Sequence, residues 1–334
     1  MSDPISLPSR ITGAIYGLAI CDALGGPVEF KARGSFPKVT NMQPNHNFNL
    51  PAGCFTDDTS MALCLAHALL DNDGRSDTID QVENYISWWR EGFQSSTGAC
   101  FDIGITAQCT LTRWDSLLRK KNQGLRARKD VRAFIQQSII DTFSNEDFCG
   151  NGSLMRVLPV SLVARSEAEA VDLAAATSLP THPHSRCVHA CSLYAGLAYQ
   201  ALNGILKDDL AISLAKSVSN TPLDPVLKQR LQDYHVRENW QAKPSDEISS
   251  TGYVVDSLEA ALWAFFNTET FEDGAILAVN LGDDADTVGA IYGGMAGAYY
   301  GFDAIPEQWH RDLRRKDLLD EVVRKLLLHR EKAE

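Results

Sequence analysis

The 334-residue sequence predicts an all-α protein that forms a single domain over residues 1–334, and three observations support this prediction. Apolar residues recur at helical spacing in most segments. Alternating patterns that would indicate strands are scarce, and neither an internal repeat nor a linker divides the chain. The stretch 281–301 joins three aspartates to an apolar run in which glycine recurs every fourth residue (Gly289, Gly293, Gly297 and Gly301). Because each glycine costs a helix roughly 1 kcal/mol relative to alanine, we expect a second helix to pack closely on this ridge, in the middle of the protein.

The remaining elements follow in chain order from the same periodicity. Ile11, Ala14, Ile15 and Leu18 predict a helix over 9–26, and 31–54 is expected to be a loop because it holds Pro, Gly and Asn without a period. Further helices are predicted over 55–70, 78–95, 166–178, 181–202, 251–265 and 308–331. The basic run 113–132 predicts a solvated face. The polar segment 205–250 is expected to combine helices with surface loops.

Composition restricts the compartment and the partners. The net charge of −12 argues against a nucleic-acid partner, which would require a basic face. Eight cysteines show no CxxC pair, and the N-terminus lacks a basic and an apolar secretory segment, so we expect a cytoplasmic protein, with the nucleus as the alternative. The longest apolar stretch expected, 288–300, is shorter than the roughly 20 residues that span a bilayer. We therefore expect no membrane partner. We also expect a monomer.

Two acidic clusters predict a metal site. Thr56-Asp57-Asp58-Thr59 opens one predicted helix, and Asp283-Asp284-Ala285-Asp286-Thr287 opens another about 230 residues later. A single N-cap residue would satisfy a helix start, so paired carboxylates in both places favour metal over capping. Oxygen ligands suit Mg²⁺ or Mn²⁺, and two such ions would orient an oxygen-rich substrate. The residues alone indicate a metal-assisted hydrolase acting on a phosphate- or sugar-containing substrate.

Other candidates have a structural alternative of similar weight. Glu29 lies just past a helix end and by itself would be interpreted as solvated, and Asp102 precedes a helix that it could cap. The turn Gly150-Asn151-Gly152-Ser153 could hold a phosphate through its amides. His182 and His184 flank Pro183 at a helix start, where capping or a structural hydrogen bond is expected rather than zinc.

Seven segments together resemble the ADP-ribosylglycohydrolase family in the family's own order, from residue 17 to 294. They are GLAICDALGGPVEF, FTDDTSMAL, CFDIGIT, GNGSLMR, THPHS, TGYVVDSLEAALWAF and GDDADTVGAIYGG. The resemblance implies a compact orthogonal helical bundle and a dinuclear Mg²⁺ or Mn²⁺ centre. It also implies hydrolysis of the bond between ADP-ribose and an acceptor, either on a protein or in a small ADP-ribose compound.

The resemblance also assigns roles to individual positions. Metal ligation is implied for Thr56, Asp57, Asp58, Asp284, Asp286 and Thr287, with Asp283 outside the matched positions. Catalysis is implied for Asp102 and Glu29, and we expect them to share the acid–base work because cleavage of a ribosyl bond needs a proton for the leaving group and a base for water. Substrate contacts are implied for Gly150, Asn151, Gly152, Ser153, His182 and Tyr253.

The acceptor and the class of protein leave alternatives open. An ADP-ribosyl-arginine hydrolase is expected first, and hydrolysis of ADP-ribosyl-serine or of O-acetyl-ADP-ribose would keep the same mechanism. A non-catalytic protein on this scaffold, like the jellyfish crystallins that resemble the family, would be expected to lack metal ligands, yet every ligand type is present. An unrelated all-α phosphohydrolase would require metal-binding histidines in an HD-type arrangement, which we do not find in the sequence.

Overall fold

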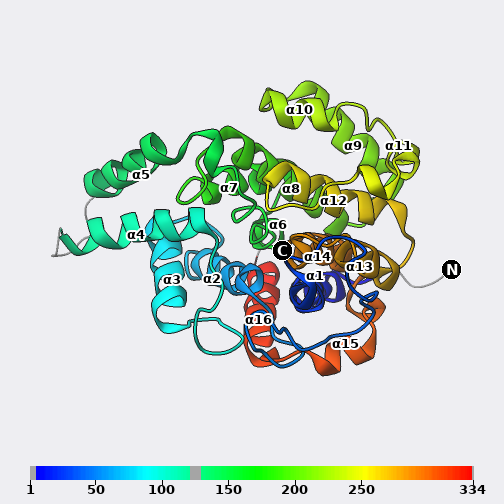
Figure 1. The fold of residues 1–334 in the computed structure, drawn as a ribbon. Coiled ribbons are helices and arrows are strands. Elements are labelled where there is room, and N and C mark those ends of the chain that lie inside the picture. Colours follow the sequence, from blue (N-terminus) through cyan, green and yellow to red (C-terminus); the bar gives the residue numbers. More distant parts are fainter. Residues whose placement is uncertain (1–4, 121–128, 333–334) are drawn as a thin grey trace.

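The structure is a computed structural model that describes residues 5–120 and 129–332, and it confirms the all-α prediction. Within these ranges helices alternate with loops, and the only extended pairings are the isolated bridges Asn45–Leu50 and Gly150–Tyr253. The single-domain organisation stays a prediction. Figure 1 shows α1 and α14 side by side at the centre, with the other helices arranged around them.

The helices have the following bounds, in chain order: α1 Leu7–Gly25, α2 Asp57–Asp71, α3 Thr78–Glu91, α4 Ile105–Lys120, α5 Lys129–Phe143, α6 Pro159–Val163, α7 Glu167–Ser178, α8 Ser185–Leu202, α9 Lys207–Asn220, α10 Pro225–Leu231, α11 Arg237–Ala242, α12 Val254–Asn267, α13 Phe271–Val279, α14 Ala285–Tyr300, α15 Glu307–Asp312 and α16 Lys316–Glu331. The loop expected over 31–54 is confirmed. Of the basic run 113–132, residues 121–128 lie outside the described part of the chain.

The glycine ridge of α14 packs against α1, as the sequence predicts. A Cβ atom built on Gly297 would lie 1.9 Å from the carbonyl oxygen of Gly13, and one on Gly293 would lie 2.1 Å from that of Gly17. The two backbones therefore touch where both helices lack side chains, and dispersion contacts along this seam offset the poor helix propensity of glycine. Gly301 ends α14 with a φ of 77°, a conformation that glycine adopts without strain.

Within the described residues, the N-terminal helix is the one segment long and apolar enough to cross a membrane by length and composition. An 18-residue window within Leu7–Val28 has the mean hydropathy (1.4) of a membrane span, but 94% of that window is buried inside the protein. A helix that is apolar all round and enclosed by neighbours is typical of a protein core. The segment with the length and hydropathy of a membrane span is therefore a buried core helix that is interrupted by Arg10 and Asp22.

The C-terminal prediction of one helix over 308–331 is wrong in its first turns. The chain forms α15 and α16, separated at Leu313–Arg315. The loop before α2 causes the break, because the Arg314 amide donates to the Gly53 carbonyl (2.9 Å) and Arg315 takes a left-handed φ of 52°. Gly53 itself lies against the Asp312 carbonyl, where a Cβ would be 2.1 Å away. A tertiary contact thus interrupts an amphipathic pattern that is otherwise helical.

Candidate active site

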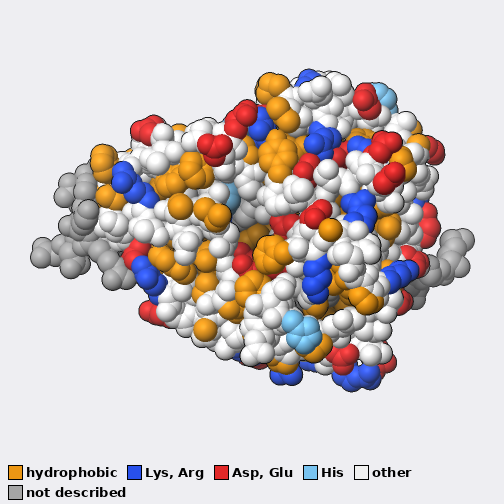
Figure 2. Space-filling model, viewed as in Figure 1, with side chains coloured by type: hydrophobic (Ala, Val, Ile, Leu, Met, Phe, Trp, Pro, Cys, Tyr) orange, Lys and Arg blue, Asp and Glu red, His pale blue; other side chains and the backbone are white. Residues whose placement is uncertain are grey.

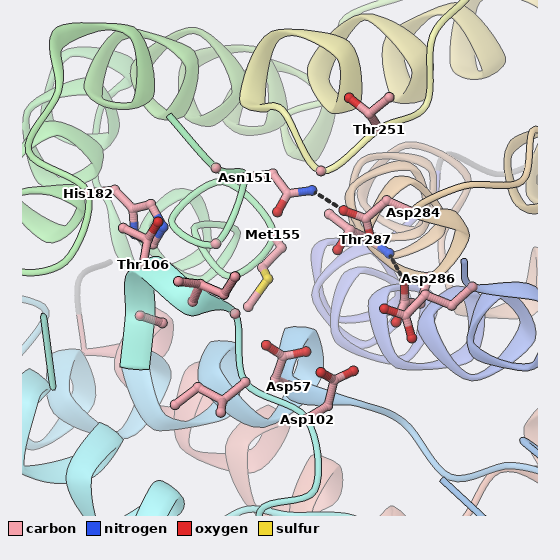
Figure 3. A pocket seen from close by; sticks show the side chains of 18 of the residues that line it. Asp57, Asp102, Thr106, Asn151, Met155, His182, Thr251, Asp284, Asp286 and Thr287 are labelled. Atoms are coloured by element: carbon pink, nitrogen blue, oxygen red, sulfur yellow. Dashed lines mark hydrogen bonds between the residues drawn. The ribbon is translucent and has the colours of Figure 1, made fainter. Parts of the chain in front are cut away.

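A pocket of about 830 Å³ lies where the starts of α2, α4 and α14 meet the turn before α6. In Figure 2 carboxylate side chains cluster near the centre of this face with hydrophobic side chains around them. Figure 3 shows how the labelled lining residues face one another across the space. Residues that the sequence singled out and that line the pocket are Glu29, Asp57, Asp102, Gly150, Asn151, Gly152, His182, Asp284, Asp286 and Thr287.

The start of α2 is capped by Asp22 of α1, and not by its own acidic cluster. The Asp22 carboxylate accepts hydrogen bonds from the amides of Thr56 (2.9 Å) and Thr59 (3.1 Å). It also accepts from the hydroxyls of the same two threonines (2.9 and 2.5 Å). Thr56, the N-cap residue, makes no side-chain cap hydrogen bond. Asp57 and Asp58 are therefore not needed to cap the helix, which removes the structural alternative for this cluster.

Sequence reasoning missed Asp22 as a site residue. It is fully buried and lies with Asp58 and Asp286 in a group whose carboxylate oxygens are within 4.8 Å of one another. A signal was available, because Asp22 is the sole charged residue between Arg10 and Glu29 in the sequence. A charge inside an apolar helix is almost never buried without a partner.

A second acidic group consists of Glu29, Asp284 and Asp286, again with oxygens within 4.8 Å. Asp286 belongs to both groups, so the two lie next to each other. Two buried carboxylate oxygens there, Glu29 Oε2 and Asp58 Oδ1, have no hydrogen-bond partner among the described residues. Unpaired buried acceptors cost free energy unless a donor or cation satisfies them. The carboxylate oxygens of the two groups are therefore a donor set that suits hard divalent cations. Because Asp286 belongs to both groups, it would lie between two cation positions.

Burial dominates the electrostatics of these carboxyl groups. It raises the pKa of Glu29 to about 10, with the nearby carboxylates of Asp102 and Asp284 adding to the effect. Burial likewise raises the pKa of Asp22 and of Asp102 to about 6. The pKa of Asp58 and that of Asp286 are raised by burial and by neighbouring carboxylates. Like charges held this close require protons or a cation.

Glu29 is only 5% exposed, so its interpretation as a solvated residue is wrong. The loop that carries it is joined to the loop before α14, because Phe30 N donates to Asp283 O (2.7 Å) and Asp283 N donates to Lys31 O (2.8 Å). Asp102 approaches the pocket from the loop before α4, where its carboxylate accepts from the Ile103 amide. The two proposed acid–base residues thus face one pocket from separate loops (Asp102 is seen in Figure 3).

Asn151 connects the glycine-rich turn to the acidic end. Its amide group donates to Asp284 Oδ2 (2.7 Å) and to Ser257 Oγ (2.8 Å), as the dashed line in Figure 3 shows for Asp284. Gly152 is required here, because a Cβ at this position would lie 2.9 Å from the His182 ring. The turn is therefore fixed in place against the residues that would hold a metal.

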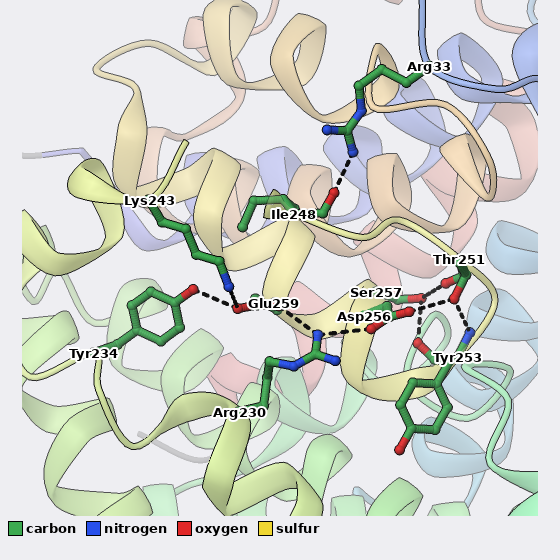
Figure 4. A network of polar contacts seen from close by, with 10 residues as sticks. All are labelled: Arg33, Arg230, Tyr234, Lys243, Ile248, Thr251, Tyr253, Asp256, Ser257 and Glu259. Atoms are coloured by element: carbon green, nitrogen blue, oxygen red, sulfur yellow. Dashed lines mark hydrogen bonds and ion pairs between the residues drawn. The ribbon is translucent and has the colours of Figure 1, made fainter. Parts of the chain in front are cut away.

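A buried ionic network positions the loop that completes this side of the pocket. Glu259, fully buried, accepts from Arg230 (2.7 Å), Lys243 (2.7 Å) and the Tyr234 hydroxyl (2.6 Å). Figure 4 shows how Arg230 extends the network to Asp256, which accepts from Thr251 at 2.7 Å. The pocket-lining loop at 251–252 is thereby anchored to the start of α12.

Four of the expected site residues are absent from the described pocket lining. Thr56 and Asp58 are buried beneath it, in contact with each other (3.0 Å). Ser153 is buried behind its turn, where it accepts from the Ser178 hydroxyl (2.9 Å). Tyr253 has its ring against the Arg186 guanidinium, 5.8 Å from the ring centre. The proposed substrate contacts of Ser153 and Tyr253 stay predictions.

The two histidines make the structural hydrogen bonds expected from the sequence. His184 is the N-cap of α8 and accepts from the Arg186 amide (3.1 Å). His182 bonds the Thr181 hydroxyl through Nδ1 (2.9 Å), and burial lowers the pKa of its imidazole well below the ordinary value. A neutral His182 ring at the pocket wall is thus available to a ligand.

Known proteins resemble this chain in sequence and in fold. Residues 3–334 match the family described as ADP-ribosylglycohydrolase. The ADP-ribosylarginine hydrolase Tri1 of Pseudomonas putida (strain GB-1) is 36% identical over 301 residues, which are 90% of this chain and 73% of that protein. The ADP-ribosyl-[dinitrogen reductase] glycohydrolase of Rhodospirillum rubrum is 28% identical over 316 residues, 93% and 92% of the two chains. A solved structure named ADP-ribosylglycohydrolase-related protein complex has a TM-score of 0.75 at 35% identity, covering 96% of this chain and 97% of that one.

Proposed function

The chain belongs to the ADP-ribosylglycohydrolase family, and from this premise we propose that it is a metal-dependent hydrolase that removes ADP-ribose from modified arginine side chains. Family membership makes it an ADP-ribosyl glycohydrolase enzyme. The arginine acceptor is supported by the Pseudomonas putida relative, whose name is ADP-ribosylarginine hydrolase. The single observation that supports metal dependence most is the pair of acidic groups sharing Asp286, with unpartnered buried oxygens on Glu29 and Asp58.

In this proposal the ligands of two Mg²⁺ or Mn²⁺ ions come from both acidic clusters. Thr56, Asp57 and Asp58 serve from the start of α2, and Asp284, Asp286 and Thr287 from the start of α14. When bound, the ions would fix the ribose hydroxyls and offset the negative charge next to the reacting carbon. Asp22 is a positioning residue, because its four hydrogen bonds orient the threonines that flank the first cluster.

Hydrolysis breaks the bond between the ribose C1″ and the arginine nitrogen, and the oxygen of water bonds to C1″. One proton leaves the water and one reaches the departing nitrogen, so a base and an acid are needed around an oxocarbenium-like transition state. Glu29 and Asp102 face the pocket from two loops and share these proton transfers. Asn151 holds the Asp284 carboxylate in position (2.7 Å) while the turn around it receives the rest of the ADP-ribose.

The decisive measurement is release of ADP-ribose from arginine-modified and from serine-modified peptides, with Mg²⁺ and with a chelator. Metal-dependent release from the arginine peptide is expected. Release from the serine peptide alone would replace the acceptor in this proposal. Release that is unaffected by thorough metal removal would contradict the metal dependence.

The acid–base roles are tested by Glu29→Gln and Asp102→Asn. Because general acid–base catalysis contributes about 100-fold to 10,000-fold, turnover should fall by at least about 100-fold in each variant. Mg²⁺ binding, measured by calorimetry, should persist in Asp102→Asn and should be weakened but not abolished in Glu29→Gln, because Glu29 belongs to one of the two acidic groups. The exposed Asp233→Asn serves as a matched charge control and should keep wild-type turnover. Wild-type turnover in either pocket variant would rule out the role assigned to that residue.

A further inference from the structure

One rim of the pocket pairs an exposed aromatic ring with a carboxylate that has no function assigned so far. Phe30 and Asp283 both line the pocket, and Phe30 is 71% exposed, although it is a large apolar side chain. Asp283 is also exposed. These two residues come from loops 253 positions apart that lie side by side at the acidic end of the pocket, next to Glu29 and Asp284.

The backbone holds both side chains at this rim. Phe30 has a φ of 64° and Asp283 a φ of 54°, a left-handed conformation that is uncommon for residues other than glycine. The Phe30 amide donates to the Asp283 carbonyl (2.7 Å), and the Asp283 amide donates to Lys31 O (2.8 Å). Gly282 permits this approach, since a Cβ there would lie 2.6 Å from Lys31 O. The ring and the carboxylate are therefore presented by a fixed double connection between the loops.

The Asp283 carboxylate makes no ion pair with any residue of the described chain. The long hydrogen bond from Ser250 Oγ (3.4 Å) is weak. Two cationic side chains follow Phe30 in the sequence, yet both are held elsewhere: Lys31 Nζ donates to Pro27 O (2.8 Å), and Arg33 Nε donates to Leu281 O (3.0 Å). Figure 4 shows the Arg33 guanidinium directed to the Ile248 carbonyl. The Asp283 carboxylate can thus pair with a ligand, because the cationic side chains of Lys31 and Arg33 donate to backbone carbonyls instead.

Among the described lining residues, the opposite end of the pocket has one carboxylate, that of the exposed Asp147, and is otherwise neutral. Gly150, Gly152 and His182 line it, and burial keeps the imidazole uncharged. Among the described residues, the amide of Gly152, which lines the pocket, donates no hydrogen bond to the protein. A diphosphate is repelled by the cluster of carboxylates at the acidic end and can accept a hydrogen bond from this free amide at the other end. The group on the other side of the ribose then points toward Phe30 and Asp283.

We propose that Phe30 and Asp283 form the acceptor subsite, in which the Asp283 carboxylate pairs with the guanidinium of the modified arginine and the Phe30 ring packs on the acceptor side chain. This inference rests on the proposed function and names the residues that select its acceptor. A guanidinium keeps its charge at all physiological pH values and presents planar donors that match a carboxylate. A ring next to it adds a cation–π contact. A serine or an acetyl acceptor offers neither charge nor donors for this pair.

The experiment compares Asp283→Asn and Phe30→Ala with the wild type on an arginine-modified peptide. Asparagine tolerates the left-handed backbone, so Asp283→Asn removes the charge without a change of conformation. Loss of a charge-assisted hydrogen bond should lower kcat/KM roughly tenfold. Loss of the ring should lower it roughly threefold. The matched controls are the exposed residues Asp233→Asn and Leu206→Ala, which lie away from the pocket.

Binding of free ADP-ribose, measured by calorimetry in the presence of Mg²⁺, separates the acceptor subsite from the rest of the pocket. ADP-ribose lacks the guanidinium, so both variants should bind it as tightly as the wild type. An equal loss of ADP-ribose affinity, or wild-type kcat/KM in both variants, would overturn the inference. Failure of the wild type itself to release ADP-ribose from arginine would instead overturn the proposed function, and the inference with it.

Discussion

Without divalent metal, the folded protein should be more stable at acidic than at alkaline pH. The raised pKa of Asp22 gives the size of this difference in the free energy of unfolding. Burial raises the pKa of this carboxyl from 3.8 to about 6, so between these values the folded state holds a proton that the unfolded chain releases. Its contribution to stability is therefore full below pH 4 and is lost as the pH rises through 6. At about 1.4 kcal/mol per pKa unit the total is about 3 kcal/mol, of which about 1.4 kcal/mol falls between pH 5 and pH 8. Asp102 and Glu29, with pKa values raised to about 6 and about 10, act with the same sign.

The assay is urea unfolding at pH 5 and pH 8, with protein stripped of divalent ions and with Mg²⁺ in excess. The metal-free protein should be less stable at pH 8. Mg²⁺ at 100 times its Kd should add about 2.7 kcal/mol and should act more strongly at pH 8, because the ligands bind it deprotonated. Asp22→Asn is the control and should reduce the pH dependence of the metal-free protein. Equal pH dependence in the variant and the wild type would refute the reasoning.

Three further predictions concern packing and position. Gly297→Ala should lower the free energy of unfolding by about 2 kcal/mol in urea titrations. The new Cβ would lie 1.9 Å from the Gly13 carbonyl oxygen, and this overpacking costs more than the helix gains in propensity. A stabilised variant would contradict the close contact between α1 and α14. Glu259→Gln should cost roughly 2 kcal/mol, since the buried carboxylate is lost and its half-buried partners Arg230 and Lys243 lose their counter-charge, and unchanged stability in the same titration would count against the network. Asn151→Ala should lower kcat/KM about tenfold through loss of its bond to Asp284, and wild-type kinetics would exclude that positioning role.

The acidic clusters could be predicted from the sequence because each is local. Asp57 and Asp58 stand at a helix start, as do Asp284 and Asp286, and a helix start fixes where its first side chains point. The glycine spacing in 289–297 likewise predicts a close helix neighbour, since only backbone contact compensates a ridge without side chains. The structure identifies that neighbour as α1.

Other parts of the site depend on contacts that no local pattern contains. Asp22 lies in an apolar helix, and only the packing of α1 against the start of α2 turns it into a cap for Thr56 and Thr59. Glu29 follows a helix end, where exposure is the usual expectation, and it is buried because its loop is joined to the loop before α14. The break at Leu313–Arg315 likewise arises from a contact with Gly53.

The sequence by itself determined the helices, the two acidic helix starts and the glycine ridge, because hydrophobic period, capping chemistry and helix propensity act over a few residues. The tertiary structure decided which carboxylates meet at Asp286, which of them is buried, and which end of the pocket is charged. It also brought Phe30 and Asp283 to one rim. The physical reason is range: burial and the repulsion of like charges depend on segments that are more than 200 residues apart in the chain and a few ångströms apart in space.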